Sequence, residues 1–269
     1  MGIVNITTDS FYAGSRSFGD EEIAARARRL ADEGADILDI GAYSSRPGAG
    51  DVPEAEESAR LERALAIVRE SVPGGVLLSV DTFRARVAAK AVGEWGADII
   101  NDISGTEPDE GMAEVVASLR CPYILMHKRG TPADMQEHTD YGGDVTASVL
   151  AELGESIARM DMAGAGDIIA DPGFGFSKTL EQNYELLRNL GVFRLLHKPI
   201  LVGLSRKSMA TKLLGIDTAD ALNATTALNV MALERGADIL RVHDVAAARE
   251  AVALFMMMTQ QESKFSCHA

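Results

Sequence analysis

Several basic side chains have the chemistry to bind a phosphorylated ligand. Arg46 lies in a segment rich in Gly and Ser. Arg206 and Lys207 follow one short apolar run, and Arg241 and His243 follow another. Arg binds phosphoryl oxygens through two hydrogen bonds, and Lys supplies a point charge. Arg46, Arg241 and His243, together with either Arg206 or Lys207, make four donors. Four donors indicate a site for more than one phosphate group.

Acceptor side chains form a second set. Asp81, Asn101 and Asp171 lie at the ends of different apolar runs, and their oxygens suit the N–H edge of a flat heterocycle. For Asp39 and Asp244, capping a helix N-terminus is an equally good interpretation. The sequence has no obvious pair of nucleophile and base. Together the two sets predict a pocket for a heterocycle that carries a diphosphate.

The composition restricts the class of ligand and the location. The chain has 269 residues and a formal net charge of −14, which argues against general binding to nucleic acid or anionic lipid. Cys121 and Cys267 lie far apart in the sequence, which indicates a reducing compartment and neither a disulfide framework nor a metal cluster. No apolar run reaches the roughly 18 residues of a membrane span. We therefore expect a cytoplasmic protein with small-molecule substrates.

The elements that must position these side chains are visible as a regular alternation. Eight short runs rich in Ile, Val and Leu have the continuous apolar character of buried parallel strands: 3–6, 37–40, 76–80, 99–103, 123–126, 168–170, 200–204 and 239–242. Amphipathic stretches typical of helices lie between them, among them 20–33, 54–70, 145–162 and 219–234. This alternation predicts one domain over residues 1–269, an α/β fold of the (β/α)8 TIM-barrel type rather than an open doubly wound sheet.

A weak internal repeat supports this interpretation. The words GADILDIG, GADIINDI, GAGDIIADPG and GADILRVHD each combine a helix-ending Gly with an Asp that leads into an apolar run. The polar run ends would then meet at the C-terminal face of the barrel, where active sites of this fold lie. Residues 7–19 and 42–52 would be mobile loops over that face.

The chain resembles the dihydropteroate synthase family over essentially its full length. The matching words, in order, are MGIVNITTDSF, DIGAYSSRPGA, SVDTFR, INDISG, DPGFGFSKT, VGLSRKSM and RVHDV. The resemblance implies a (β/α)8 barrel, usually a homodimer, of folate biosynthesis. It also implies that 6-hydroxymethyl-7,8-dihydropterin diphosphate is joined to 4-aminobenzoate, with release of diphosphate and with help from Mg²⁺.

The resemblance also implies roles for individual residues. Pterin contacts would come from Asp81, Asn101, Asp171 and Lys207, between apolar walls formed by Ile103, Met126 and Phe176. The diphosphate would be held by Arg46, Arg241 and His243, which with Lys207 form the catalytic set. The 4-aminobenzoate pocket, also the sulfonamide pocket of this family, would comprise Phe11, Ser45, Pro47 and Ser205. Asn5 would bind Mg²⁺, which prefers oxygen ligands and keeps most of its waters.

Four loop positions depart from the family pattern. Thr8 replaces a proline, and Ala13 replaces an aspartate that is associated with the amine of 4-aminobenzoate. Tyr43 and Ser45 stand where Glu and Thr are common, and Ser45 keeps the hydroxyl. These departures affect how the amine is handled and leave the reaction class unchanged.

Three alternatives remain open on the sequence. A pterin-barrel methyltransferase would share the pterin slot, yet it has no diphosphate to stabilise. A non-catalytic pterin-binding barrel would have no use for the retained cations, and Ala13 is the one feature that favours it. An unrelated phosphate-binding barrel is the third. The expected reaction is a dissociative substitution, in which diphosphate departs before the amine attacks.

Overall fold

All eight predicted strands are present and parallel. The computed structural model describes residues 1–6, 16–42, 52–104, 109–131 and 133–265. The strands are β1 (Gly2–Asn5), β2 (Ile37–Gly41), β3 (Leu77–Asp81), β4 (Ile99–Asp102), β5 (Tyr123–Met126), β6 (Ile168–Asp171), β7 (Leu201–Val202) and β8 (Ile239–Leu240). The last two are shorter than predicted, because only two residue pairs join them.

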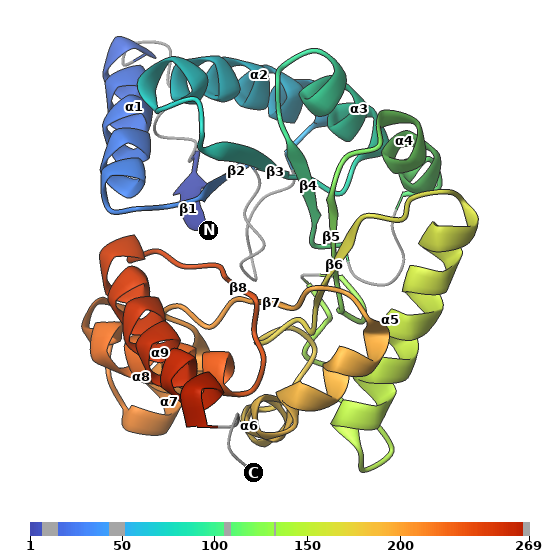
Figure 1. The fold of residues 1–269 in the computed structure, drawn as a ribbon. Coiled ribbons are helices and arrows are strands. Elements are labelled where there is room, and N and C mark those ends of the chain that lie inside the picture. Colours follow the sequence, from blue (N-terminus) through green and yellow to red (C-terminus); the bar gives the residue numbers. More distant parts are fainter. Residues whose placement is uncertain (7–15, 43–51, 105–108, 132, 266–269) are drawn as a thin grey trace.

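The strands follow one another around a barrel. β1 to β6 form one sheet in chain order, and β7 pairs with β8 in a second sheet. Single bridges connect the two sheets, from Ala170 to Ile200 on one side and from Gly2 to Val242 on the other. Figure 1 shows the strands at the centre and the helices around them. The (β/α)8 TIM-barrel class is therefore confirmed.

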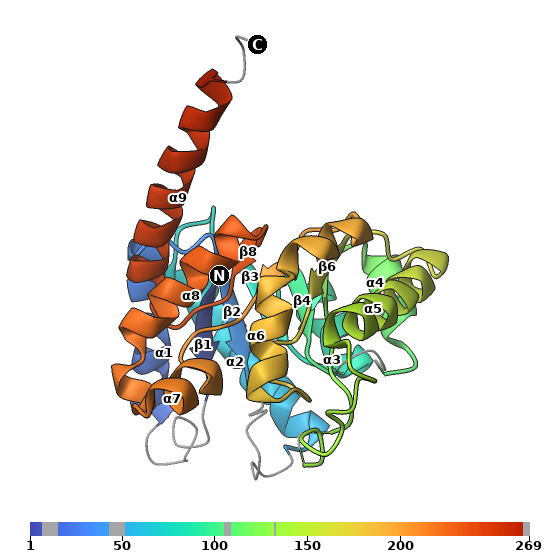
Figure 2. The ribbon, with the colours of Figure 1, turned by 90° about the horizontal axis from the view of Figure 1, so that it is seen from below.

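Helices cover the outside of the barrel. They are α1 (Arg16–Asp32), α2 (Glu54–Ser71), α3 (Ala85–Gly93), α4 (Met112–Leu119), α5 (Val145–Met162), α6 (Leu180–Arg188), α7 (Ser208–Leu214), α8 (Leu222–Glu234) and α9 (Val245–Phe265). Two 3₁₀ segments, η2 (Leu190–Leu196) and η3 (Thr218–Asp220), lie among them. The far end of α9 extends beyond the barrel (Figure 2). None of the helices in the described part of the chain is long and apolar enough to cross a membrane.

The repeated Gly at the junction between helix and strand has a structural cause. Gly34, Gly96, Gly164 and Gly236 all have positive φ values, between +77° and +96°. A residue with a Cβ rarely adopts this conformation, whereas Gly does so at little cost. The aspartate two residues later also contributes at two junctions, where its carboxylate accepts a backbone N–H from the neighbouring strand region.

The barrel interior is divided into an apolar layer and a polar layer. Ile99, Ile124, Ile169 and Leu201 form a small cluster of their own, with Ile37 and Ile239 packed against it. Successive side chains of a strand alternate between faces, so residues two positions further along point the same way. On β2, β4, β6 and β8 those positions hold Asp39, Asn101, Asp171 and Arg241. The strand period thus places the polar side chains together at the C-terminal end.

Candidate active site

Arg241 lies at the centre of the polar layer, between two carboxylates. Its Nε is 2.7 Å from Asp39 Oδ2, and its Nη2 is 2.6 Å from the same oxygen and 3.1 Å from Asp81 Oδ2. The sequence analysis assigned Arg241 to the basic side chains that would bind phosphate. It assigned Asp81 to the acceptors that would bind the heterocycle, on the opposite side of the pocket. The structure brings the two together, so the cationic and acidic halves of the pocket share this ion pair.

Asp39 is the most fully engaged carboxylate of the site. Its side chain is completely buried, Oδ1 accepts the hydroxyl of Ser79 at 2.7 Å, and Oδ2 accepts Nδ2 of Asn101 at 3.0 Å. It is not a helix cap, because it lies within β2 and points into the barrel. Sequence reasoning left this residue between two interpretations. The signal that decides is its separation of two residues from Ile37, which shares its face of the strand.

Burial raises the pKa of the Asp81 carboxyl, and the positive charge of Arg241 opposes that effect. Asp39 and Asp102 raise it further, since neighbouring negative charges disfavour ionisation. Burial also raises the pKa of Asp171, while the Lys207 ammonium and the backbone N–H of Gly173 lower it. The site therefore concentrates carboxyl groups whose protonation responds to a bound cation or hydrogen-bond donor.

Asp171, Phe176 and Lys207 lie together on the side formed by β6 and β7. Asp171 Oδ1 accepts the N–H of Gly173 at 2.8 Å. Lys207 Nζ donates to the carbonyl of Phe174 at 2.5 Å and lies 4.6 Å from the centre of the Phe176 ring. Burial lowers the pKa of Lys207 to about 8, although the charge of Asp171 opposes the shift. An ammonium, a carboxylate and an aromatic face thus border one space.

The two adjacent cations after β7 have different positions. Arg206 has a φ of +55°, and its guanidinium bonds Asp244 at 2.8 and 3.0 Å and the carbonyls of Thr218 and Ala219. It ties the chain to the outside of the barrel. Lys207 Nζ donates instead to the carbonyl of Phe174. Of the two cations, Lys207 is therefore the one that lies beside the loop after β6.

The remaining described residues of the predicted set lie at the ends of strands or in the segments that follow them. Ser205 is buried, and its hydroxyl is 3.0 Å from Nδ1 of His243. Met126 is buried at the end of β5, Ile103 is half-buried after β4, and Asn5 is exposed at the end of β1. Phe11, Ser45, Arg46 and Pro47, as well as Ala13 and Tyr43, lie outside the described residues.

Lys128 is a cation that the sequence analysis did not single out. Its side chain is largely buried directly after β5, and burial lowers its pKa. The charges of Asp102, Asp134 and Asp81 oppose that shift. The feature of the sequence that could have identified Lys128 is its position two residues after Met126, the last residue of β5.

Comparison with known proteins gives consistent matches. Residues 1–243 match the family described as pterin binding enzyme. The dihydropteroate synthase of Escherichia coli K12 is 41% identical over 256 residues, which are 94% of this chain and 88% of that protein. A probable bifunctional folylpolyglutamate synthase/dihydropteroate synthase of Haloferax volcanii is 42% identical over 247 residues, and this chain spans only 29% of its length.

Solved structures agree with the sequence matches. The dihydropteroate synthase of Xanthomonas albilineans, solved with 4-aminobenzoic acid, superposes with a TM-score of 0.86. The two sequences are 39% identical, and the superposition covers 96% of this chain and 92% of that one.

Proposed function

The chain belongs to the family of pterin binding enzymes, and on that premise we propose that it is a dihydropteroate synthase of folate biosynthesis. It joins 6-hydroxymethyl-7,8-dihydropterin diphosphate to 4-aminobenzoate and releases diphosphate. The observation that carries the proposal is the polar layer, in which Asp81, Asn101, Asp171, Lys207 and Arg241 meet at the ends of five strands. These residue types suit a pterin ring next to an anion.

Pterin recognition is assigned to the acceptors and the lysine. Asp171 in its ionised form accepts two N–H groups from the edge of the ring, and the nearby ammonium of Lys207 favours that form. Asp81 and Asn101 contact the opposite edge. Phe176 and Met126 contribute apolar surface to the slot, which suits a flat heterocycle.

Stabilisation of the leaving group is assigned to Arg241, His243 and Arg46. Among the described residues, Nη1 of Arg241 has no hydrogen-bond partner, whereas Nε and Nη2 are held by Asp39 and Asp81. A guanidinium fixed on one side can present its free edge to phosphoryl oxygens without reorganising. Arg46 lies outside the described residues, so its part rests on the family resemblance.

The chemistry follows from what these groups can supply. The bond from the pterin methylene to the diphosphate oxygen breaks, and its electron pair leaves with the diphosphate. The nitrogen of 4-aminobenzoate then bonds to the methylene and loses a proton. An arylamine is already nucleophilic at neutral pH, so the site has to stabilise charge and exclude water rather than provide a strong base. In their ionised forms, which Arg241 favours for Asp81 and Lys207 favours for Asp171, these two carboxylates would stabilise an electron-deficient pterin.

Asn5 fits the Mg²⁺ that this chemistry uses. It is exposed at the end of β1 and offers an amide oxygen, and no cluster of three or more His, Cys, Asp or Glu within the described part of the chain forms a competing cage. Mg²⁺ is commonly held by one or two protein oxygens together with water and phosphate oxygens. When bound, it neutralises charge on the departing diphosphate.

The amine site is assigned to Ser205 together with Phe11, Ser45 and Pro47 of the loops. Ser205 is buried and hydrogen-bonded to His243, and this contact supports an amine site next to the proposed leaving-group site. The homodimer and the cytoplasmic location also belong to this proposal. Exposed apolar side chains on α9 support a dimer, and the buried free thiol of Cys121 suits a reducing compartment.

The function is tested by product formation. The purified protein is incubated with the dihydropterin diphosphate, 4-aminobenzoate and Mg²⁺, and 7,8-dihydropteroate is measured by chromatography and mass spectrometry. We expect product that depends on both substrates and declines when Mg²⁺ is chelated. Binding of the pterin without any product would contradict the synthase and favour a binding-only barrel.

The assignment of Arg241 has its own test. Arg241→Lys keeps a positive charge near Asp39 and Asp81 but loses the planar donor edge, so kcat should fall by about 100-fold. Arg235→Ala is the matched control, because that exposed guanidinium bonds only a carbonyl of its own helix and a neighbouring glutamate. A kcat of Arg241→Lys close to that of the control would remove Arg241 from the clamp.

A further inference from the structure

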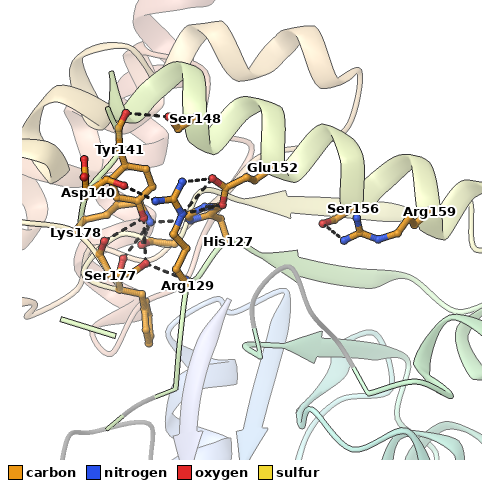
Figure 3. Close-up of polar contacts among 12 residues, drawn as sticks. His127, Arg129, Asp140, Tyr141, Ser148, Glu152, Ser156, Arg159, Ser177 and Lys178 are labelled. Carbon is orange, nitrogen blue, oxygen red and sulfur yellow. Dashed lines mark hydrogen bonds and ion pairs between the residues drawn. The ribbon is translucent and has the colours of Figure 1, made fainter. Parts of the chain in front are cut away.

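A buried cluster of polar side chains lies behind the loop that connects β6 to α6. Figure 3 shows Lys178, His127 and Glu152 in line, with Arg129 and Tyr141 beside them. None of these residues belongs to the predicted site. Lys178 is only 3% exposed and His127 is fully buried, whereas Glu152 and Arg129 are partly exposed, so the cluster extends from the interior to the surface.

Lys178 directs its ammonium into the loop that carries it. Nζ donates to the carbonyl oxygens of Gly173 and Phe176 at 3.0 and 3.1 Å, and it bonds His127 Nδ1 at 3.0 Å. Three acceptors match the three N–H donors of an ammonium. Burial lowers the pKa of Lys178 to about 7, and the charge of Asp171 opposes that shift. Whether charged or neutral, its amino group has N–H donors for both carbonyls, so this one side chain fixes the loop at two backbone positions.

His127 connects this lysine to α5. Its Nε2 is 2.9 Å from Glu152 Oε2, and the carboxylate is also paired with Arg129. Burial and the charge of Lys178 lower the pKa of His127 to about 4, so the ring is neutral near pH 7. The hydrogen-bond partners then assign the proton to Nε2, which leaves Nδ1 to accept from Lys178. The lysine is thereby anchored to a rigid helix.

The loop needs such an anchor because its backbone is constrained. Gly173 has a φ of +71°, and a Cβ added there would lie 1.8 Å from the carbonyl oxygen of His127. Ser177 has a φ of +47°, and its hydroxyl accepts the N–H of Arg129 at 3.1 Å. Unfavourable φ values persist only where the surroundings hold them. The conformation of residues 172–177 thus depends on its contacts with the cluster.

The other side of the same loop forms the pterin slot. Asp171 precedes it and accepts the N–H of Gly173, the carbonyl of Phe174 receives Lys207, and the ring of Phe176 lies beneath Lys207. Two ammonium groups therefore hold neighbouring carbonyls of one short loop, Lys207 from the pocket and Lys178 from behind.

We propose that Lys178 is a positioning residue for the pterin slot, which acts by holding residues 172–177 against His127 so that Asp171, Phe176 and Lys207 keep their mutual geometry. The inference rests on the proposed function for the identity of the ligand. It assigns Lys178 no contact with substrate, and its effect should therefore fall on pterin affinity rather than on the amine.

The test compares Lys178→Met with Lys198→Met as the matched control. Lys198 also donates to a carbonyl, that of Gly166, but it lies before β7 at the opposite end of the barrel. In Lys178→Met we expect the Kd for the dihydropterin diphosphate, measured by calorimetry, and its KM to rise about tenfold, since two carbonyls lose a hydrogen-bond donor. The KM for 4-aminobenzoate should stay within about twofold of wild type. A pterin Kd like that of the control would overturn the proposal.

A second readout needs no ligand. Hydrogen exchange of the backbone amides of residues 173–177 in Lys178→Met should be at least about tenfold faster than in wild type, with α5 and α6 unchanged. Unchanged loop exchange would refute the positioning role even if the wild type made no dihydropteroate. If the loop exchanged faster in Lys178→Met but the wild type bound no pterin, the proposed function would be rejected and the positioning role of Lys178 would be retained. If Lys178→Met does not fold, Lys178→Gln, which retains a neutral hydrogen-bond donor, is tested in its place. The same outcomes then apply.

Discussion

At the scale of single residues, the site depends on a carboxylate that touches no proposed substrate. Asp39 fixes Nε of Arg241 on one side and Nδ2 of Asn101 on the other, and Ser79 completes its shell. A buried guanidinium without a partner would be costly, and a buried carboxylate without donors equally so. Asp39 is therefore not a helix cap. It orients Arg241 and Asn101, the two side chains proposed to bind the ligand.

Replacing Asp39 with Asn should impair catalysis more than folding. The amide keeps the shape and can still bond Ser79, but it removes the charge that orients Arg241. We expect kcat/KM to fall about 100-fold, because small displacements of catalytic groups have effects of that size. Steady-state kinetics on Asp39→Asn and on Ser79→Ala, which should lose much less, would measure it. Equal losses in the two variants would contradict the orienting role.

The pKa of His127 predicts a dependence of stability on pH. The ordinary value is 6.5, and in the folded protein it is lowered to about 4. Between these values the unfolded chain binds a proton that the folded chain does not, so stability is complete above pH 6.5 and is lost as the pH falls toward 4. The free energy of unfolding should fall by up to about 3 kcal/mol more in wild type than in His127→Gln. Parallel urea-unfolding curves of the two proteins from pH 7 to 4 would contradict this assignment.

At the scale of elements, the loop between β6 and α6 connects the core to the pocket. Gly173 lies so close to the His127 carbonyl that no side chain fits, and Tyr141 bonds the carbonyl of Ser177 at 3.0 Å. The loop is therefore packed closely against the cluster behind it. Its sequence, DPGFGFSKT, combines the slot residues with the lysine that holds them.

Gly173→Ala should be strongly destabilising. Both the positive φ and the contact with His127 oppose a methyl group, so we expect a loss of about 3 kcal/mol or more in the free energy of unfolding. Gly143→Ala is the control, because its φ of +93° is also positive while nothing lies within 4 Å of an added Cβ. That variant should lose about 1 kcal/mol. Equal losses in chemical denaturation would show that contact with His127 contributes nothing.

The elements were predictable from sequence because their signals are local. Apolar runs and helix-ending glycines gave eight strands and four junctions that the structure confirms. The residue types alone left Arg206 and Lys207 as alternatives, and only the family resemblance singled out Lys207. The contacts of Arg206 with Asp244 and with the carbonyls of Thr218 and Ala219 depend on tertiary packing, so they were not predictable. The Lys178 cluster was also missed, because its partners His127 and Glu152 are brought together only by the packing of α5.

At the scale of the whole molecule, the proposed function requires an acidic protein to bind an anionic substrate through a few cations. The net charge of −14 is spread over the chain, while Arg241, Lys207 and Lys128 gather at one end of the barrel. Low dielectric surroundings strengthen their effect on a bound phosphate. Recognition is therefore local, and the overall charge need not attract the ligand.

The exposed apolar side chains of α9 predict self-association. Leu254 is 73% exposed and Met257 is 63% exposed, and α9 extends from the barrel (Figure 2). Burying them against a second copy would remove apolar area from water. Wild type should sediment as a dimer, and Met257→Glu should shift the equilibrium toward monomer. A dimer of unchanged affinity in Met257→Glu would place the interface on another surface.

The central claim is that the polar layer promotes departure of diphosphate and capture of the pterin by an amine. The most direct measurement is diphosphate release from the dihydropterin diphosphate with Mg²⁺, followed with and without 4-aminobenzoate. The account predicts release that increases with the amine and matches dihydropteroate one for one. Tight pterin binding with no release, or release that the amine does not change, would contradict it.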